Sequence, residues 1–215
     1  MGRRKQEPRS AHRERIAAAA SELFLERGTA AVSMDEIAGA AGYSKATLYV
    51  YFANKEEIVC LLALESMRKL QSYIAAALAE EEATEARYGR ICRGLVRYQR
   101  EFPLYFRMAL ERIDTDFAGR DVLPEERETY WVGEAINGQL RDFLEEGMER
   151  GDLRRDLEVM PVIFYFWGML SGLIQLAASK AAYLAGAAGL PEDLFLEGGF
   201  RMLYRAIAAG EGERK

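Results

Sequence analysis

Apolar residues recur along this chain at intervals of three and four, the spacing that places them on one face of an α-helix. No stretch alternates apolar and polar residues as a half-buried strand would. The pattern therefore predicts an all-α protein with about nine helices. Two short helices are expected between Ser33 and Phe52, and the others over residues 10–27, 55–79, 84–101, 103–112, 124–150, 157–184 and 191–209.

The segment from Ser33 to Ile58 carries the strongest local signals. Ser33 and Glu36 have the S-x-x-E spacing of a capping box, in which each side chain bonds to the backbone of the other residue. Gly42 lacks a Cβ and can end the first helix with a positive φ, and Ser44 can then cap a second helix. The sequence thus predicts a helix, a three-residue turn and another helix, followed by a third helix that Asn54 caps.

On the second of these helices, Leu48 and Phe52 fall together and are expected to face inward. The opposite side is small and apolar, with a phenol on each flank and a cation in the first turn, which is typical of a surface that enters the DNA major groove. There, methyl groups can meet thymine methyls and hydroxyls can donate to phosphates. The residues on this side are Lys45, Ala46, Thr47, Tyr49, Val50 and Tyr51.

Over its first quarter the chain resembles the TetR family of bacterial transcriptional regulators. The resemblance begins near Ile16 and rests on the motifs ASELFLERG, SMDEIAGAAGYS, TLYVYF and NKEE, in this order and spacing. It implies a three-helix DNA-binding domain over residues 1–54 and a helical ligand-binding and dimerisation domain over residues 55–215. It also implies phosphate contacts by Ser33, Tyr49, Tyr51 and Lys55, and base contacts by Lys45, Ala46 and Thr47. The alternative is that the tyrosines pack between helices and that Lys55 is a solvated charge.

The net charge of −5 would repel DNA on average, so the distribution of charge matters more than its sum. The first twenty residues carry six basic and two acidic side chains, a local balance of +4. A basic arm ahead of a helix-turn-helix can follow the phosphate backbone or enter the minor groove. Such an arm can equally be disordered and unspecific.

Nothing in the sequence indicates catalysis. His12 is the only histidine, and it lies among arginines rather than beside an acid and a nucleophile. Cys60 and Cys92 have no metal-ligand spacing and follow no secretory signal, so we expect reduced thiols in the cytoplasm, with a redox switch as the disfavoured alternative. We expect no metal, no cofactor and no enzymatic activity, although an acid/base pair among the many carboxylates stays open.

Residues 159–179 form an uncharged stretch that is long enough to cross a bilayer. Its flanks differ little in basic charge and no other segment resembles it, so we favour a helix that is buried on one side and meets a second copy of the chain on the other. The TetR resemblance implies such a homodimer through the last two helices. The expected interface residues are Tyr165, Gly168, Gly172, Gln175 and Ser179, and no membrane contact is expected.

Aromatic residues and methionines concentrate between residues 98 and 170, which suggests an apolar cavity for a flat or lipophilic effector. Plain core packing is the alternative for each of them. The expected lining residues are Tyr98, Phe102, Phe106, Trp131, Phe143, Phe166 and Leu170. The sequence therefore indicates a homodimeric DNA-binding regulator, a repressor by analogy, that a small molecule releases from a near-palindromic operator. A helical enzyme and a membrane-associated helical protein stay as alternatives.

Overall fold

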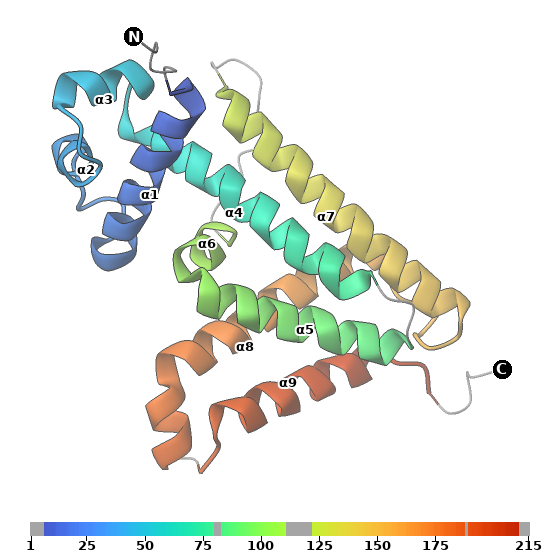
Figure 1. The fold of residues 1–215 in the computed structure, drawn as a ribbon. Helices are drawn as coiled ribbons and strands as arrows, with labels where there is room; N and C mark the ends of the chain where they lie inside the picture. Colours follow the sequence, from blue (N-terminus) through green and yellow to red (C-terminus); the bar gives the residue numbers. More distant parts are fainter. Residues whose placement is uncertain (1–6, 80–82, 111–121, 188, 211–215) are drawn as a thin grey trace, which may run out of the picture. The chain divides into compact units, whose positions relative to one another are not determined.

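The computed structural model describes residues 7–79, 83–110, 122–187 and 189–210. This part of the chain contains nine α-helices and no strand, which confirms the predicted fold class. Figure 1 shows them in chain order. The helices are α1 (Arg9–Arg27), α2 (Met34–Ala40), α3 (Lys45–Tyr51), α4 (Lys55–Leu78), α5 (Thr84–Glu101), α6 (Pro103–Met108), α7 (Pro124–Glu149), α8 (Val159–Ala187) and α9 (Glu192–Ile207).

The helix bounds follow the predicted ones closely, with two differences. Helix α6 ends at Met108, earlier than expected, and residues 111 and 112 of the expected helix lie outside the described residues. Helix α8 continues to Ala187, three residues beyond the expected end near residue 184, and includes Gly186.

The chain packs as two units. The first contains residues 1–68 and 102–131, and the second contains residues 69–101 and 132–215. Both α4 and α7 therefore contribute to both units, because the start of each helix packs in the first unit and the rest in the second. The division into a DNA-binding part over residues 1–54 and a ligand-binding part over residues 55–215 concerns function and stays a prediction.

The core of the first unit joins α1, α2, α3 and the start of α4, with α6 against them. Leu48 and Phe52 are 0% and 1% exposed, which confirms the predicted inward face of α3. They pack in a cluster with the apolar stripe of α1, and two residues of α6 complete it. The other fully enclosed members of this cluster are Ile16, Ala17, Ala20, Phe24, Val32, Ile37, Ile58 and Leu62.

Local capping fixes α2 and α3 as the sequence predicts. The Ser33 hydroxyl accepts from the N–H of Glu36, and the Glu36 carboxylate accepts from the N–H of Ser33 at 2.8 Å, so the capping box is complete. Gly42 has a φ of +74°, and the Ser44 hydroxyl accepts from the N–H of Thr47 at 3.1 Å. The short turn between α2 and α3 is therefore specified by residues within it.

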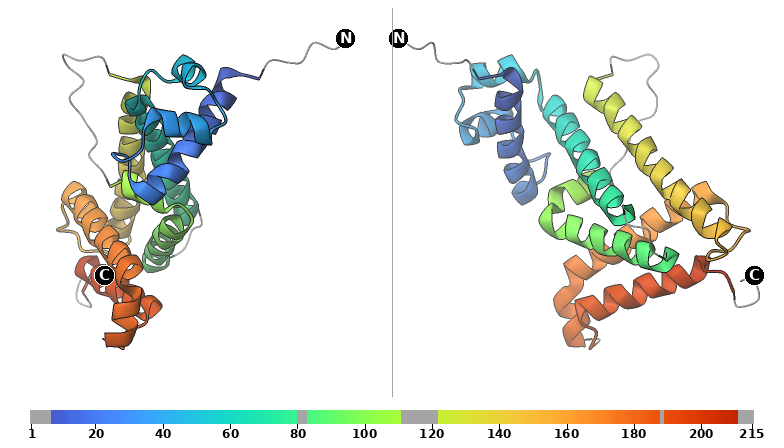
Figure 2. Two further views of the ribbon diagram at one scale, coloured as in Figure 1. Left: turned by 90° about the vertical axis from the view of Figure 1, so that its left-hand side faces the viewer. Right: turned by 45° about the vertical axis from the view of Figure 1, so that its right-hand side comes forward.

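In the second unit, α8 and α9 lie side by side and α5 packs on both, as Figure 2 shows. The loop after α7 is fastened to the end of α9 by two backbone hydrogen bonds. Arg154 donates to the carbonyl of Ile207, and Ala209 donates to the carbonyl of Asp152, each at 2.9 Å. The buried core of this unit includes Tyr88, Ile91, Cys92, Leu95, Tyr98, Ile163, Leu170, Ile174 and Leu203.

Candidate nucleic-acid interface and effector cavity

Helix α3 is held at both of its ends. Ser44 caps the N-terminus, and two arginines of α1 bond to the last carbonyl groups, which have no partner inside the helix. Arg9 donates to the carbonyl oxygen of Val50 at 2.8 Å, and Arg13 donates to that of Tyr51 at 3.0 Å. Cations at a helix C-terminus also interact favourably with the helix dipole. A helix of only seven residues, which would be unstable alone, is thereby fixed in one orientation.

The side of α3 that the sequence assigned to DNA is open to solvent. Val50 is 61% and Tyr49 45% exposed, Lys45 and Ala46 are exposed, and Thr47 is half-buried. The ammonium group of Lys45 lies 2.8 Å from a carboxylate oxygen of Asp35, and the hydrogen bond from Lys45 to Asp35 raises the pKa of the lysine. Surface pairs of this kind are weak, so the lysine can exchange Asp35 for another anion.

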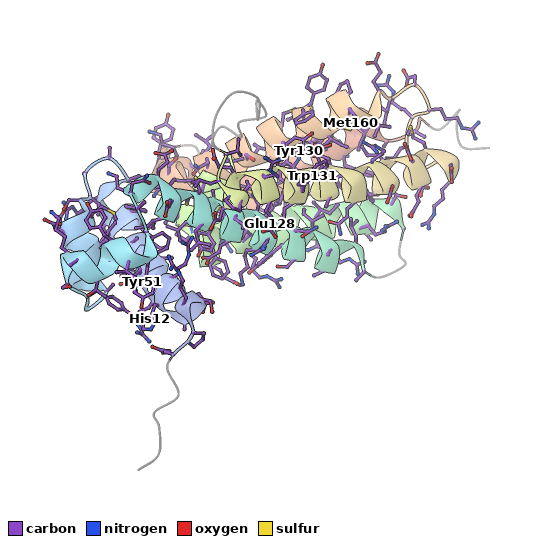
Figure 3. All side chains as sticks on the ribbon, turned by 90° about the horizontal axis from the view of Figure 1, so that it is seen from above. His12, Tyr51, Glu128, Tyr130, Trp131 and Met160 are labelled. Carbon is purple, nitrogen blue, oxygen red and sulfur yellow. The ribbon has the colours of Figure 1, made fainter. Side chains whose placement is uncertain are left out.

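Tyr51 differs from Tyr49 because its ring packs inside a cluster of α1 residues. It stacks on His12, with ring centroids 4.9 Å apart, as the labelled side chains in Figure 3 show. The His12 Nδ1 atom lies 2.6 Å from the hydroxyl oxygen of Tyr43, which also accepts from Arg15 at 2.7 Å. The expected phosphate contact by Tyr51 stays a prediction, and any such contact comes from a half-buried side chain.

Two further residues with an expected phosphate role already bond within the protein. Lys55 donates to the carbonyl oxygens of Thr29 at 2.7 Å and Val32 at 2.8 Å, in the loop between α1 and α2. The hydroxyl of Ser33 donates to the Glu36 carboxylate at 2.7 Å. Hydrogen bonds from the Ser33 hydroxyl and backbone, and then from Arg27, lower the pKa of Glu36 to about 2. Both residues therefore organise the start of α2, Lys55 through the loop that leads into it and Ser33 through its N-terminal cap.

The contacts of Arg9 and Arg13 with α3 were not predicted from the sequence. Their signal in the sequence is a spacing of four residues at the start of α1, which places both on one side of that helix. The partner helix cannot be read from this spacing, because it depends on how α1 and α3 cross.

A small cavity lies in the second unit, with a volume of about 50 Å³. Three of the residues predicted for an effector site, Phe143, Phe166 and Leu170, line this cavity, and their contact with an effector stays a prediction. Tyr98 does not line it and is fully buried, with its ring 5.4 Å from that of Tyr73. The remaining lining residues are Ile74, Tyr88, Ile91, Leu95, Leu140, Leu144, Val162, Ile163, Trp167 and Ile207.

Phe102, Phe106 and Trp131 belong to the first unit and do not line this cavity. Phe102 stacks on Tyr105, and Phe106 is buried. Trp131 is 62% exposed and meets Tyr130 edge to face, and Figure 3 labels both on α7. Sequence spacing alone does not separate these aromatic residues from those of the cavity, because α7 runs through both units.

The cavity is apolar, and none of its described lining residues is charged. The hydroxyl of Tyr88 donates to the carbonyl oxygen of Phe200 at 3.1 Å, and burial raises its pKa. Ligand pockets for drug-sized molecules usually have volumes of about 300 to 1,000 Å³. A lipophilic molecule of that size would therefore have to move the walls apart.

One side of α8 is both apolar and exposed. Tyr165 is 65% exposed, and Gly168, Gly172 and Ser179 are exposed beside it, while Gln175 is half-buried. The neighbouring exposed apolar residues on α8 and α9 are Phe164, Met169, Leu176, Tyr183, Leu194 and Met202. Among the helices of the described residues, α8 alone is long and apolar enough to cross a membrane. The core helices of soluble proteins can have the same length and composition, so this is weak evidence for a membrane span.

No group of three or more His, Cys, Asp or Glu side chains within the described residues is arranged to hold a metal ion. Cys60 and Cys92 are buried and not joined to each other in a disulfide. Burial raises the pKa of the Cys92 thiol to about 12, so its reactive thiolate form is rare at neutral pH.

Known proteins are similar to this chain in the helix-turn-helix region. Residues 16–60 match the sequence pattern of "Bacterial regulatory proteins, tetR family". The transcriptional activator FasR of Mycolicibacterium smegmatis is 41% identical over 71 residues, which cover 33% of this chain and 32% of FasR. The chain thus matches about a third of the length of this relative.

Solved structures extend the similarity of the fold to nearly the whole chain. The TetR family regulator PfmR of Thermus thermophilus has a TM-score of 0.66 and 26% identity, covering 89% of this chain and 97% of PfmR. AibR, whose structure contains isovaleryl coenzyme A and operator DNA, has a TM-score of 0.67 and 20% identity, covering 90% of this chain and 98% of AibR.

Proposed function

Residues 16–60 carry the N-terminal domain of the tetR family of bacterial regulatory proteins, and on this premise we propose that the chain is a DNA-binding transcriptional regulator. We propose that the protein acts in the cytoplasm. We propose no catalytic role, because the members of the tetR family are regulatory proteins. The observation that carries the proposal is the exposed face of α3, which presents Lys45, Ala46, Tyr49 and Val50 on a helix that is capped at both ends.

Such a helix reads few base pairs, so we propose a homodimer that reads two half-sites. The exposed apolar side of α8 and α9 supports this, because exposed apolar patches of this kind mark interaction sites. Gly168 and Gly172 lie four residues apart on that side, which permits close approach of a second backbone. Two recognition helices related by twofold symmetry would lie about 34 to 36 Å apart, on a near-palindromic operator.

We propose that a small lipophilic or aromatic effector binds in the cavity between α4, α5, α7, α8 and α9. The apolar lining supports this class of ligand. AibR, which shares the fold, was solved with both a ligand and operator DNA. To change the DNA-competent fraction from 99:1 to 1:99, the effector must prefer the other conformation by about 5.5 kcal/mol.

The experiment that tests DNA binding is footprinting on genomic fragments, followed by affinity measurements on the protected site. Tyr49→Phe should weaken binding to every sequence, whereas Thr47→Ala and Lys45→Ala should change the preference among sequences. Arg155→Ala, which removes an exposed cation in the loop after α7, is the matched control and should leave the affinity unchanged. If no fragment is protected, or if the α3 variants bind like the control, the proposed function is wrong.

The direction of regulation needs its own test, since FasR carries the name of an activator. We propose repression. A reporter gene behind the protected site should be transcribed more strongly when this protein is absent. Lower transcription in its absence would identify an activator instead.

The exposed apolar side of α8 also allows an association with a membrane. The two explanations differ in what covers this side. A dimer that sediments as a single species without detergent supports the proposed function, whereas recovery only in the membrane fraction contradicts it.

A further inference from the structure

Arg13 of α1 makes three contacts that join separate elements of the first unit. Its guanidinium donates to the carbonyl oxygen of Tyr51 at 3.0 Å and to the carboxylate of Glu125 at 2.7 Å. The same group lies 4.2 Å from the centroid of the Phe52 ring. The side chains of Arg13 and Glu125 are 23% and 21% exposed, so the pair is partly shielded from solvent and salt.

The Tyr51 carbonyl is the end of the proposed recognition helix. Carbonyl groups in the last turn of a helix have no partner within it, so the group that bonds to them fixes where the helix ends and how it points. Arg9 bonds to the neighbouring carbonyl of Val50, but within the described residues it forms no hydrogen bond to α7. Arg13 therefore differs from Arg9 because it bonds to both α3 and α7.

Glu125 lies in the first turn of α7, and later residues of the same helix line the cavity. Leu140, Phe143 and Leu144 form one wall of it. Glu125 and Phe143 lie 18 positions apart, which corresponds to about 27 Å of continuous helix. An α-helix is stiff along its axis, so a movement of the wall residues is passed on to Glu125.

The cavity has to enlarge before it can hold an effector. Its volume of about 50 Å³ is several times smaller than the usual pocket of about 300 Å³ or more. Helix shifts in regulated proteins are commonly about 1 to 2 Å. A shift of that size is enough to break a hydrogen bond of 2.7 Å.

The start of α7 and the end of α3 border a hollow of about 370 Å³, which Arg13 also lines. Leu123, Pro124 and Glu125 form one side of it, and Tyr49 to Ala53 form another. Because this space is not filled by side chains, little apolar packing is available to carry a displacement from α7 to α3. The hydrogen bonds of Arg13 to Tyr51 and Glu125 connect α3 and α7 instead.

We propose that Arg13 is a positioning residue that couples α7 to the recognition helix. Its ion pair with Glu125 holds the end of α3 in the DNA-binding orientation, and displacement of α7 by an occupied cavity releases it. This inference rests on the proposed function, because it assigns the route by which the effector would act.

A double-mutant cycle tests the coupling without knowledge of the effector. Leu144→Trp fills the cavity and pushes its walls apart, while Glu125→Gln removes the charged partner of Arg13. Leu144→Trp should weaken binding to the footprinted fragment at least fivefold in the wild-type background, the lower end of ordinary allosteric coupling. In the Glu125→Gln background the same substitution should change affinity by less than twofold. Equal effects in both backgrounds would overturn the inference, since independent sites combine additively to within about twofold.

Glu128→Gln is the matched control, because Glu128 lies one turn further along α7 and pairs with Arg68 of α4. The full effect of Leu144→Trp should persist in this background. If Glu128→Gln removes the effect and Glu125→Gln does not, α4 carries the displacement and the inference is wrong. Leu170→Trp fills the same cavity from α8 and replaces Leu144→Trp if that variant does not fold.

Hydrogen exchange gives a readout that needs no DNA. The amide of Phe52 donates to the carbonyl of Leu48 at 3.1 Å and reports on the end of α3. Leu144→Trp should speed exchange of this amide at least fivefold in the wild type and not in Glu125→Gln, and Arg13→Lys should restore protection that Arg13→Gln loses. Equal acceleration in both backgrounds refutes the coupling. A protein that protects no DNA but shows this exchange pattern would refute only the proposed function.

Discussion

The ammonium nitrogen of Lys55 lies 2.8 Å from the carbonyl oxygen of Val32, and 2.7 Å from that of Thr29. The first residue of α4 thus closes the loop that leads into α2. Val32 itself is fully buried in the core of the first unit, so the lysine anchors the loop where it enters the core. A residue expected to contact phosphate therefore also stabilises the fold.

Replacing Lys55 by methionine should lower the free energy of unfolding by about 1 to 3 kcal/mol, because partly buried carbonyl groups lose their donor. Lys45→Met is the matched control. It breaks only an exposed pair with Asp35 and should cost much less stability than Lys55→Met. Denaturant unfolding measures both values. Equal stabilities for the two variants would show that the Lys55 bonds contribute little.

The same two variants also separate structure from DNA contact. If Lys55 reaches a phosphate, its loss should reduce the slope of log affinity against log salt by about one, in addition to the loss of stability. An unchanged slope with reduced stability would assign Lys55 to the fold alone.

Glu36→Gln should destabilise the protein in a pH-dependent way. Bonds from Ser33 and Arg27 lower the pKa of Glu36 from 4.5 to about 2 in the folded state. A lowered pKa contributes stability above pH 4.5, and this contribution is lost as the pH falls from about 4.5 to about 2. The difference in stability between wild type and variant should thus shrink as the pH falls through this range, and thermal melts from about pH 7 to about pH 3 measure it. Glu26→Gln, an exposed change on α1, is the control, and a constant gap for Glu36→Gln would contradict the assignment.

Replacement of two glycines of α7 by alanine should change the stability of the protein in opposite directions. A Cβ at Gly147 would lie 2.7 Å from Leu153 Cδ1 and 2.9 Å from Thr84 Cγ2, so Gly147→Ala should cost about 1 to 3 kcal/mol of stability. A Cβ at Gly138 would meet nothing within 4 Å, and Gly138→Ala should gain about 0.5 to 1 kcal/mol through helix propensity. Thermal melts give both signs. A stabilised Gly147→Ala variant would mean that Leu153 moves aside at little cost.

The Cys92 thiol should resist modification in the native protein. It is fully buried, and burial raises its pKa to about 12, so only roughly one molecule in ten thousand carries the thiolate at pH 8. In a Cys60→Ala background, a thiol reagent should label Cys92 within minutes only after denaturation. Rapid labelling of the native protein would contradict this and reopen a redox role.

Several features of the helix-turn-helix can be predicted from short stretches of sequence. The capping box of Ser33 and Glu36, the positive φ of Gly42 and the cap by Ser44 each depend on atoms no more than four residues apart. Hydrogen bonds of this range form within one turn, so residue types and spacing are enough to predict them. The inward face of α3 follows for the same reason, because helical periodicity fixes which residues share a side.

The cavity of the second unit shows what such short-range patterns cannot predict. Phe143, Phe166 and Leu170 were expected at the cavity and lie there, whereas Phe102 and Trp131 have the same apolar character and lie in the other unit. Apolar periodicity indicates that a side chain is buried in the protein or contacts a partner. It does not state which helices surround it, because that depends on crossing angles between elements far apart in the chain.

The sequence by itself determined the helices of the described residues, the turn before α3 and the residues on its open face, since each follows from contacts within one or two helical turns. Only the tertiary structure decided what holds that helix in place. Arg13 reaches Tyr51 across 38 positions and Glu125 across 112, and no local spacing encodes either partner. Such contacts form after the helices have packed, when the burial of apolar side chains has brought distant polar groups within hydrogen-bond distance.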